Sequence, residues 1–403
     1  MNIKTQTMAS CSCSTLPSLS CLQATLTTVA IFLVSLVSDF SLSTSSTLTT
    51  GNGFRKIYAF GDSYTDTGNT HSSTGPTNFE YVSSPPYGTT FFHQPTNRYS
   101  DGRLVIDFVA EAFSLPYLPP YLNQNVDTSH GVNFAVAGST AIDHDFFVIN
   151  NLTLDSTPQS LHTQLTWFNK FLEDNGCGGT TTLSSSAECR RALDDALFWV
   201  GEIGVNDYAY LVGSTVSPTT IQDLAINSIT GFLQELLKRG AKYVVVQGLP
   251  MTGCLSMAME FSLLTDRDDV GCVGSINMLS SMHNSALQDK LQGLRRQYPD
   301  AIIAYADYFS AYHAIIKNHH KYGFQEPFKT CCGSGGDPYN FVPFATCGSP
   351  AASTACSNPA QFINWDGVHL TEAMYKATAD LFLHRSYSHP PFSVLMSRRT
   401  HGN

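Results

Sequence analysis

Five short apolar segments, separated by segments with helical periodicity, predict an alternation of strands and helices along most of the chain. The predicted strands are Lys56–Phe60, Val132–Val136, Leu197–Ile203, Tyr243–Gln247 and Ala301–Tyr305. The amphipathic segments between them are Leu104–Ala112, Pro158–Leu172, Ile221–Lys238 and Ile276–Tyr298. This alternation predicts an α/β fold in which helices cover both faces of a mostly parallel sheet. His283 lies on the apolar face of the last helical segment, and we interpret it as a satisfied, part-buried histidine rather than a ligand.

Three regions fall outside this alternation. Residues 1–48 form a Ser/Thr-rich leader whose apolar stretch, Leu26 to Val37, suits the core of a signal peptide and is short for a membrane span. An organelle transit peptide is the alternative. The stretch from Cys331 to Pro359 is rich in Gly, Ser, Pro and Cys, and predicts a disulfide-tied loop on the active-site side. We therefore expect one domain at 54–385 and a loose C-terminal tail at 386–403.

The composition and net charge argue against nucleic acid as a partner and against a membrane span in the mature chain. The chain has 403 residues, 42% of them hydrophobic and 13% charged, which is typical of a globular protein with an ample core. Its net charge of −10 leaves no basic surface for nucleic acid. No long apolar segment follows the leader, so we expect no membrane span in the mature chain. The oligomeric state is left open.

The number and placement of the cysteines support secretion of the protein. Eight follow the leader, and they cluster in loop-like sequence, which is typical of disulfides formed in an oxidising compartment. Cys331 and Cys332 are adjacent rather than spaced as Cys-x-x-Cys, which argues against zinc. We predict the local pairs Cys177–Cys189 and Cys254–Cys272. The sequon Asn151-Leu152-Thr153 predicts glycosylation at Asn151 in a secreted protein.

Residues suited to acyl transfer follow the predicted strands. Ser63 comes after the first strand, Gly138 after the second and Asn206 after the third, while Asp366 and His369 lie near the C-terminus. Acyl transfer needs a nucleophile, a base, a group that orients the base, and donors for the oxyanion. Ser63, His369 and Asp366 can fill the first three roles. The N–H groups of Ser63 and Gly138 and the Asn206 amide can supply the donors, and no metal or cofactor is needed.

Each of these residues also has an ordinary structural explanation. Ser63 and Asn206 could be turn residues, Gly138 a glycine at the end of a strand, and Asp366 the cap of a helix that starts near Leu370. Their joint order, each at the end of a predicted element, favours a site.

Longer blocks around these residues resemble the plant-type GDSL esterase/lipase family of the SGNH hydrolase superfamily. The matching blocks are Phe60-Gly61-Asp62-Ser63 with Asp66-Thr67-Gly68-Asn69, Asn133 to Gly138, Gly204-Val205-Asn206-Asp207, and Asn364 to Glu372. Ser100-Asp101-Gly102-Arg103 and Cys331-Cys332-Gly333 are also similar to family members. The resemblance implies a three-layer α/β/α sandwich, flavodoxin-like, with a five-stranded parallel sheet. It also implies the roles assigned above to Ser63, Asp366, His369, Gly138 and Asn206.

Two positions depart from the family pattern. The Leu that usually follows the serine is Tyr64, and Ser139 stands where Ala is common after the glycine. Neither change removes a catalytic group. We expect Tyr64 to contact the substrate at the acyl entrance and to alter substrate preference.

These observations predict a secreted serine carboxylic-ester hydrolase that works through an acyl-enzyme. Its expected partner is a small-molecule ester of a lipid, a sugar or a plant metabolite. Acyl transfer to an acceptor other than water uses the same residues and is the alternative within this chemistry. A secreted binding protein that retains the fold without catalysis is the alternative from another class. It is disfavoured because the nucleophile, the base, the orienting Asp and the oxyanion donors are all present.

Overall fold

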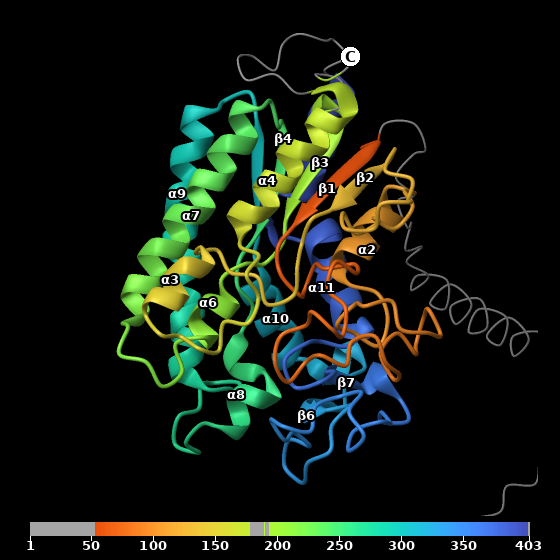
Figure 1. Ribbon diagram of the computed structural model, residues 1–403, viewed down its shortest axis with the longest axis vertical. Coiled ribbons are helices and arrows are strands. Elements are labelled where there is room, and N and C mark those ends of the chain that lie inside the picture. The colour runs from red at the N-terminus through yellow and green to blue at the C-terminus, as the bar shows by residue number, and fades with distance from the viewer. Residues whose placement is uncertain (1–52, 178–188, 190–192, 402–403) are drawn as a thin grey trace, which may run out of the picture. The chain divides into compact units, whose positions relative to one another are not determined.

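The computed structural model describes residues 53–177, 189 and 193–401. The predicted leader lies outside the described residues. The main sheet has the strand order β2-β1-β3-β4-β5-β8 (Figure 1). Its strands are β1 (Lys56–Phe60), β2 (Gly131–Asn133), β3 (Ala196–Val200), β4 (Tyr243–Gln247), β5 (Ile302–Ala306) and β8 (Ser388–His389). The first five pair in parallel, and β8 adds an antiparallel edge to β5.

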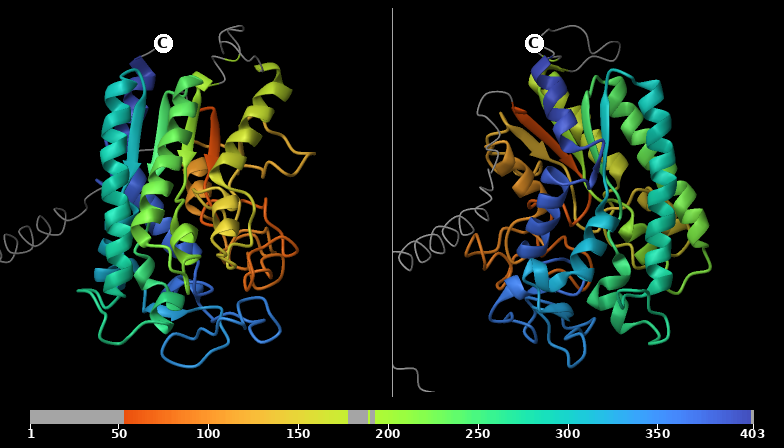
Figure 2. Two further views of the ribbon diagram at one scale, coloured as in Figure 1. Left: turned by 60° about the vertical axis from the view of Figure 1, so that its left-hand side comes forward. Right: turned by 180° about the vertical axis from the view of Figure 1, so that it is seen from behind.

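Helices cover both faces of this sheet, as the rotated views show (Figure 2). The longer ones are α2 (Val105–Ala112), α4 (Leu161–Leu172), α7 (Pro218–Lys238), α9 (Gly274–Gln297), α10 (Tyr308–Lys317), α11 (Glu372–His384) and α12 (Phe392–His401). Shorter helices are α3 (His144–Ile149), α6 (Val205–Ala209) and α8 (Ser256–Glu260). A second, two-stranded sheet joins β6 (Glu326–Thr330) to β7 (Phe362–Asn364).

Side-chain alternation along the strands divides the core into two layers. On β1, Ile57 and Ala59 pack with α2, α10, α11 and α12, whereas Tyr58 and Phe60 pack with α4, α7 and α9. A buried strand sends successive side chains to opposite faces, so both faces of β1 are apolar. The expected three-layer α/β/α fold is confirmed.

The chain after residue 385 differs from the loose tail that we expected. It supplies strand β8 and helix α12, and Phe392 and Leu395 are buried in the core layer that contains α2 and α11. The five parallel strands form as expected, and β8 adds a sixth, antiparallel strand to the sheet. Strand β2 ends at Asn133, earlier than predicted, although the N–H groups of Phe134 and Val136 still donate to the carbonyls of Ala59 and Gly61 (2.7 and 3.3 Å).

Four disulfides stabilise the loops. Cys177–Cys189 and Cys254–Cys272 form as predicted, and Cys331–Cys356 and Cys332–Cys347 tie the loop between β6 and β7. The main-chain N–H of Cys332 donates to the carbonyl of Trp365 (2.7 Å), next to Asp366. The disulfide-tied loop therefore supports the segment that carries two of the predicted site residues.

Candidate active site

Ser63 lies in a tight turn at the carboxyl end of β1. Gly61 starts the turn with a φ of 140°, a value that favours glycine. The carbonyl of Asp62 then accepts the N–H groups of Thr65 (3.0 Å) and Asp66 (2.9 Å). The turn leaves the Ser63 side chain at the edge of the sheet, where parallel α/β folds place their sites.

The structure brings Ser63, His369 and Asp366 together. Nε2 of His369 lies 2.8 Å from Oγ of Ser63, and Nδ1 lies 2.7 Å from Oδ2 of Asp366. The exposed fractions are 6% for Ser63, 3% for His369 and 0% for Asp366. This is a continuous hydrogen-bonded chain from a hydroxyl through an imidazole to a buried carboxylate, the arrangement that activates a serine.

Asp366 is held as a carboxylate by its donors. Its Oδ1 accepts the N–H groups of His369 (2.7 Å) and Val368 (3.0 Å), and its Oδ2 also accepts the hydroxyl of Tyr87 (2.8 Å). Burial by itself raises the pKa of this carboxyl, but the charge of His369 and these hydrogen bonds outweigh it, so the pKa lies below its ordinary value. Asp366 can therefore orient and stabilise an imidazolium at His369.

Aromatic rings enclose the imidazole of His369. The rings of Tyr99, Phe79 and Tyr64 have centroids 4.6, 5.6 and 5.8 Å from that of the imidazole. These contacts restrain the ring of His369, which is 3% exposed. A restrained base keeps its proton-transfer geometry between the steps of a reaction.

Two main-chain N–H groups are available to an oxyanion. Neither the Ser63 nor the Gly138 N–H donates to any group of the described part of the chain. Gly138 has a φ of 79°, and a Cβ there would approach Oγ1 of Thr157 at 2.2 Å and Cγ of Pro76 at 2.8 Å. A side chain at this position would be strained and would collide with its neighbours, which explains the glycine.

The Asn206 amide reaches the same place from α6. Its Nδ2 donates to Oδ2 of Asp62 (3.1 Å) and to the carbonyl of Ser139 (3.0 Å). Both N–H bonds are therefore engaged in the free protein, and an acyl oxygen would have to take one of them. The roles of Gly138 and Asn206 as oxyanion donors stay predictions, with geometry that suits them.

A buried polar network fixes the segment after Ser63. Asp66 accepts the N–H groups of Gly68, Asn69 and Thr70, and that of Ala137 from the segment after β2. The Asn69 amide donates to the carbonyls of Asn133 and Ala135, and the Asn133 amide donates to that of Thr65. The motif residues around the serine thus join the turn after β1 to the strand end that carries Gly138.

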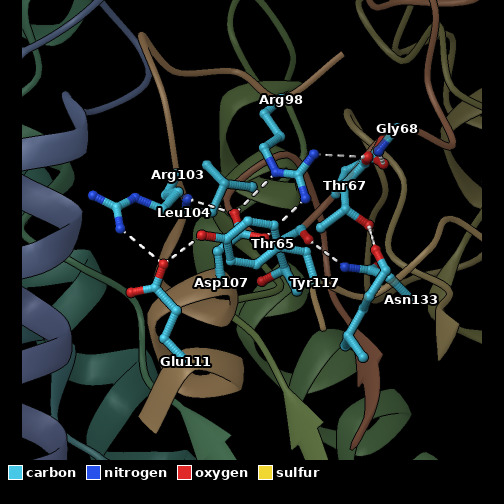
Figure 3. A network of polar contacts seen from close by, with 12 residues as sticks. Thr65, Thr67, Gly68, Arg98, Arg103, Leu104, Asp107, Glu111, Tyr117 and Asn133 are labelled. Atoms are coloured by element: carbon cyan, nitrogen blue, oxygen red, sulfur yellow. Dashed lines mark hydrogen bonds and ion pairs between the residues drawn. The ribbon is translucent and has the colours of Figure 1, made fainter. Parts of the chain in front are cut away.

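An ion pair anchors the same turn to α2 (Figure 3). Arg98 donates from Nε and Nη2 to the two carboxylate oxygens of Asp107 at 2.9 and 2.8 Å, and from Nη1 to the carbonyl of Thr67 (3.3 Å). Both side chains are nearly buried, at 7% and 1% exposed. Sequence reasoning gave no role to this pair, because its partners become neighbours only in the folded chain.

The block Ser100-Asp101-Gly102-Arg103 holds the start of α11, directly after the histidine. Arg103 pairs with Glu372 (2.8 Å), and Oδ1 of Asp101 accepts the N–H of Glu372 (2.7 Å). A Cβ at Gly102 would lie 2.0 Å from the Glu372 carboxylate, so the glycine permits this close approach. The block therefore positions the loop that carries Asp366 and His369.

Tyr64 lies between the serine turn and the histidine loop. It is 3% exposed, and its hydroxyl donates to the carbonyl of Val368 at 2.7 Å. Its ring packs against those of Tyr308, Tyr375 and His369. Substrate contact by Tyr64 stays a prediction, and the interaction that the structure gives it is one with the loop before His369.

Three buried residues near the site were missed from the sequence. Gln164 hydrogen-bonds both main-chain groups of Gly61, Tyr87 donates to Asp366, and Glu202 lies beside Asp62. Gln164 interrupts the buried stripe of α4, and Glu202 is a charged residue in a predicted apolar strand. Gln164 and Glu202 could have been identified as polar residues within apolar segments, whereas no sequence pattern marks Tyr87.

Two further predicted residues lie away from the triad. Asn151 is exposed at the end of α3, so a glycan would be sterically accommodated, and its glycosylation stays a prediction. His283 is buried, with the hydroxyl of Tyr208 3.1 Å from Nδ1 and no partner for Nε2. Burial lowers its pKa to about 4, so it is a neutral core histidine.

The described residues contain no group of three or more His, Cys, Asp or Glu side chains able to hold a metal ion. None of the helices among them has the length and apolar character needed to cross a membrane.

Known proteins resemble this chain over most of its length. The family model "GDSL-like Lipase/Acylhydrolase" matches residues 57–382. A GDSL esterase/lipase of Arabidopsis thaliana is 55% identical over 95% of this chain and 98% of its own. Acetylajmalan esterase 1 of Rauvolfia serpentina is 40% identical over 82% of this chain and 86% of its own, and sinapine esterase of Brassica napus is 38% identical over 84% and 88%.

Proposed function

Because the chain belongs to the GDSL family of esterases and lipases, and is a carboxylic ester hydrolase of that family, we propose that it works as a serine esterase with Ser63, His369 and Asp366 as its catalytic triad. The observation that carries the proposal is the hydrogen-bonded chain from Oγ of Ser63 through His369 to Asp366, with links of 2.8 and 2.7 Å.

The reaction begins with attack of Oγ of Ser63 on the ester carbonyl carbon, while Nε2 of His369 takes the hydroxyl proton. The carbonyl oxygen becomes an oxyanion beside the N–H groups of Ser63 and Gly138 and the Asn206 amide. The intermediate then collapses, the C–O bond to the alcohol breaks, and the alcohol oxygen leaves with the proton from His369. The acyl group remains on Ser63.

Water completes the cycle by the same route. His369 takes a proton from the water as its oxygen attacks the acyl carbon, and Asp366 stabilises the imidazolium in both halves of the reaction. Collapse of the second intermediate releases the acid and returns the proton to Ser63.

We further propose that the substrate is a small ester with a short acyl group. Ser63 and His369 expose only 6% and 3% of their surfaces, so the entrance to the nucleophile is narrow. Two of the three relatives named above are an acetylajmalan esterase and a sinapine esterase, which supports an ester of a plant metabolite.

Export through the secretory pathway is also part of the proposal. The four disulfides support it, because such bonds form and persist in oxidising compartments. A full-length fusion to a fluorescent protein should reach the culture medium or the cell wall. Retention in an organelle would favour the transit-peptide alternative.

The test of the proposed function is hydrolysis of p-nitrophenyl acetate, butyrate and palmitate, with Ser63→Ala as the control. We expect the wild type to hydrolyse acetate faster than palmitate and the variant to lose all turnover. Equal turnover by wild type and variant would refute the triad. A preference for palmitate would refute the short acyl pocket while leaving the triad intact.

A further inference from the structure

Glu202 is a buried acid two residues after the end of β3, and one of its carboxyl oxygens has no hydrogen-bond donor in the described part of the chain. Its side chain is fully buried, and Oε1 accepts the N–H of Val205 at 3.1 Å. Oε2 is also buried and has no donor in the described part of the chain. A buried carboxylate oxygen without a donor is costly, so the charge state of Glu202 needs explanation.

The neighbour of Glu202 is another acid, Asp62, which precedes the nucleophile. The two carboxyl groups lie beside each other, because Glu202 accepts the N–H of Val205 and Asp62 accepts the side chain of the next residue, Asn206, and each acid acts on the ionisation of the other. Asp62 is only 1% exposed. Ionised carboxylates only accept hydrogen bonds, so a hydrogen bond between the two acids requires a proton on one of them. Two buried carboxylates in contact cannot both carry charge, and one of them stays protonated.

The other contacts decide which acid holds the proton. Asp62 accepts two N–H bonds, from the main chain of Tyr64 (3.0 Å) and from the side chain of Asn206 (3.1 Å), whereas Glu202 accepts one. Donated hydrogen bonds favour the charged form. Burial, followed by the charge of Asp62, raises the pKa of Glu202 well above its ordinary value, while burial raises the pKa of Asp62 only to about 6. The proton therefore resides on Glu202.

We propose that Glu202 is a positioning residue, which remains protonated at neutral pH and donates its proton to Asp62, so that Asp62 holds the Asn206 amide in the oxyanion site. The inference rests on the proposed function, since it assigns Asn206 to the oxyanion. With one proton shared, the pair carries a single negative charge beside the oxyanion instead of two. The shared proton also weakens Asp62 as an acceptor, so that Asn206 can transfer an N–H bond from Asp62 to the acyl oxygen.

The surroundings keep this proton in place. Other ionisable groups that act on the pair come from the serine turn, α6 and its C-cap, α10, the segment before α11, and α11 itself. They are Asp66, Tyr64, Asp207, Tyr210, Tyr308, His369 and Tyr375. The charge of Asp207 opposes ionisation of Glu202, and that of Asp66 opposes ionisation of Asp62, so both disfavour a second negative charge on the pair.

Infrared spectroscopy on the resting protein tests the proton directly. Glu202→Gln is the matched variant, because its amide can accept from Val205 and donate to Asp62 as the protonated acid does. At neutral pH the wild-type minus Glu202→Gln difference spectrum should contain the carbonyl stretch of one protonated carboxylic acid. Its absence would overturn the proposal. This readout needs no turnover, so it holds or fails separately from the loss of activity in Ser63→Ala.

A double-mutant cycle tests the positioning role. Glu202→Gln should keep kcat within about threefold of the wild type. Glu202→Met, which cannot donate, should lower kcat by about tenfold or more, up to the loss of about 10²–10³ known for removal of an oxyanion donor. In an Asn206→Ala background, Glu202→Met should lower kcat no further. Additive losses in the double variant, or loss of kcat in Glu202→Gln with an unchanged melting temperature, would overturn the proposal.

Discussion

The hydroxyl of Tyr64 links the two halves of the proposed triad, and removing it has a calculable effect. Tyr64→Phe keeps the ring contacts with Tyr308 and Tyr375 and deletes the 2.7 Å bond to the carbonyl of Val368. One such hydrogen bond contributes about 0.5–1.5 kcal/mol to the free energy of unfolding. For a domain of this size, a loss of about 1 kcal/mol lowers the melting temperature by roughly 2 °C.

The loss of transition-state stabilisation in Tyr64→Phe cannot exceed the free energy that this hydrogen bond contributes. If the whole bond also helps to hold His369 in the transition state, a loss of about 1 kcal/mol lowers kcat by roughly fivefold. We expect equal factors for acetate, butyrate and palmitate esters, because the deleted hydroxyl bond joins Tyr64 to the histidine loop, whereas the ring that would meet a substrate is kept.

The assay compares kcat/KM for the three p-nitrophenyl esters with the melting temperature of each variant. Ser388→Ala is the matched control, since it deletes a buried hydroxyl-to-carbonyl bond (2.9 Å, to Phe382) at the edge strand β8. Ser388→Ala should lower the melting temperature about as much as Tyr64→Phe does and leave kcat unchanged. A change of more than about tenfold in the acetate-to-butyrate ratio for Tyr64→Phe, which is over 1.4 kcal/mol of specificity, would refute this reasoning and place Tyr64 in the acyl pocket.

Three further variants test other parts of the site. Asn206→Ala should lower kcat by about 10²–10³, the loss expected for one oxyanion donor; a wild-type kcat would remove Asn206 from that role. Asp366→Asn should lower kcat on the order of 10⁴, because the amide cannot hold the same tautomer of His369, and a loss below tenfold in steady-state assays would contradict the triad. Arg98→Met leaves Asp107 as a buried, unpaired charge and should cost about 3–5 kcal/mol of unfolding free energy, measured by urea titration; an unchanged midpoint would contradict that account.

Local patterns predicted the parts of the fold that depend on local physics. Strand β1 and the serine turn were predictable because an apolar run ends abruptly at Gly61. The C-terminal edge was not predictable in the same way. Strand β8 is two residues long, and Leu395 becomes a core residue only because α12 packs on the layer that contains α11. Such contacts depend on tertiary packing, which a local pattern does not encode.

Some residues of the candidate site could likewise be predicted from local sequence patterns, whereas others could not. Ser63, Gly138 and Asn206 follow strands that were predicted, so their meeting at one edge of the sheet could be inferred. Tyr87 reaches Asp366 from a loop 279 positions away in sequence, with no pattern to mark it.

The most direct measurement of the central claim is labelling by a fluorophosphonate, which reacts covalently with an activated serine. The full chain, with disulfides intact, would be treated with the probe and mapped by peptide mass spectrometry beside the Ser63→Ala variant. We predict one adduct per chain, on Ser63, and none in the variant. An unlabelled wild type, or an adduct at another residue that persists in Ser63→Ala, would contradict the assignment of Ser63 as the nucleophile.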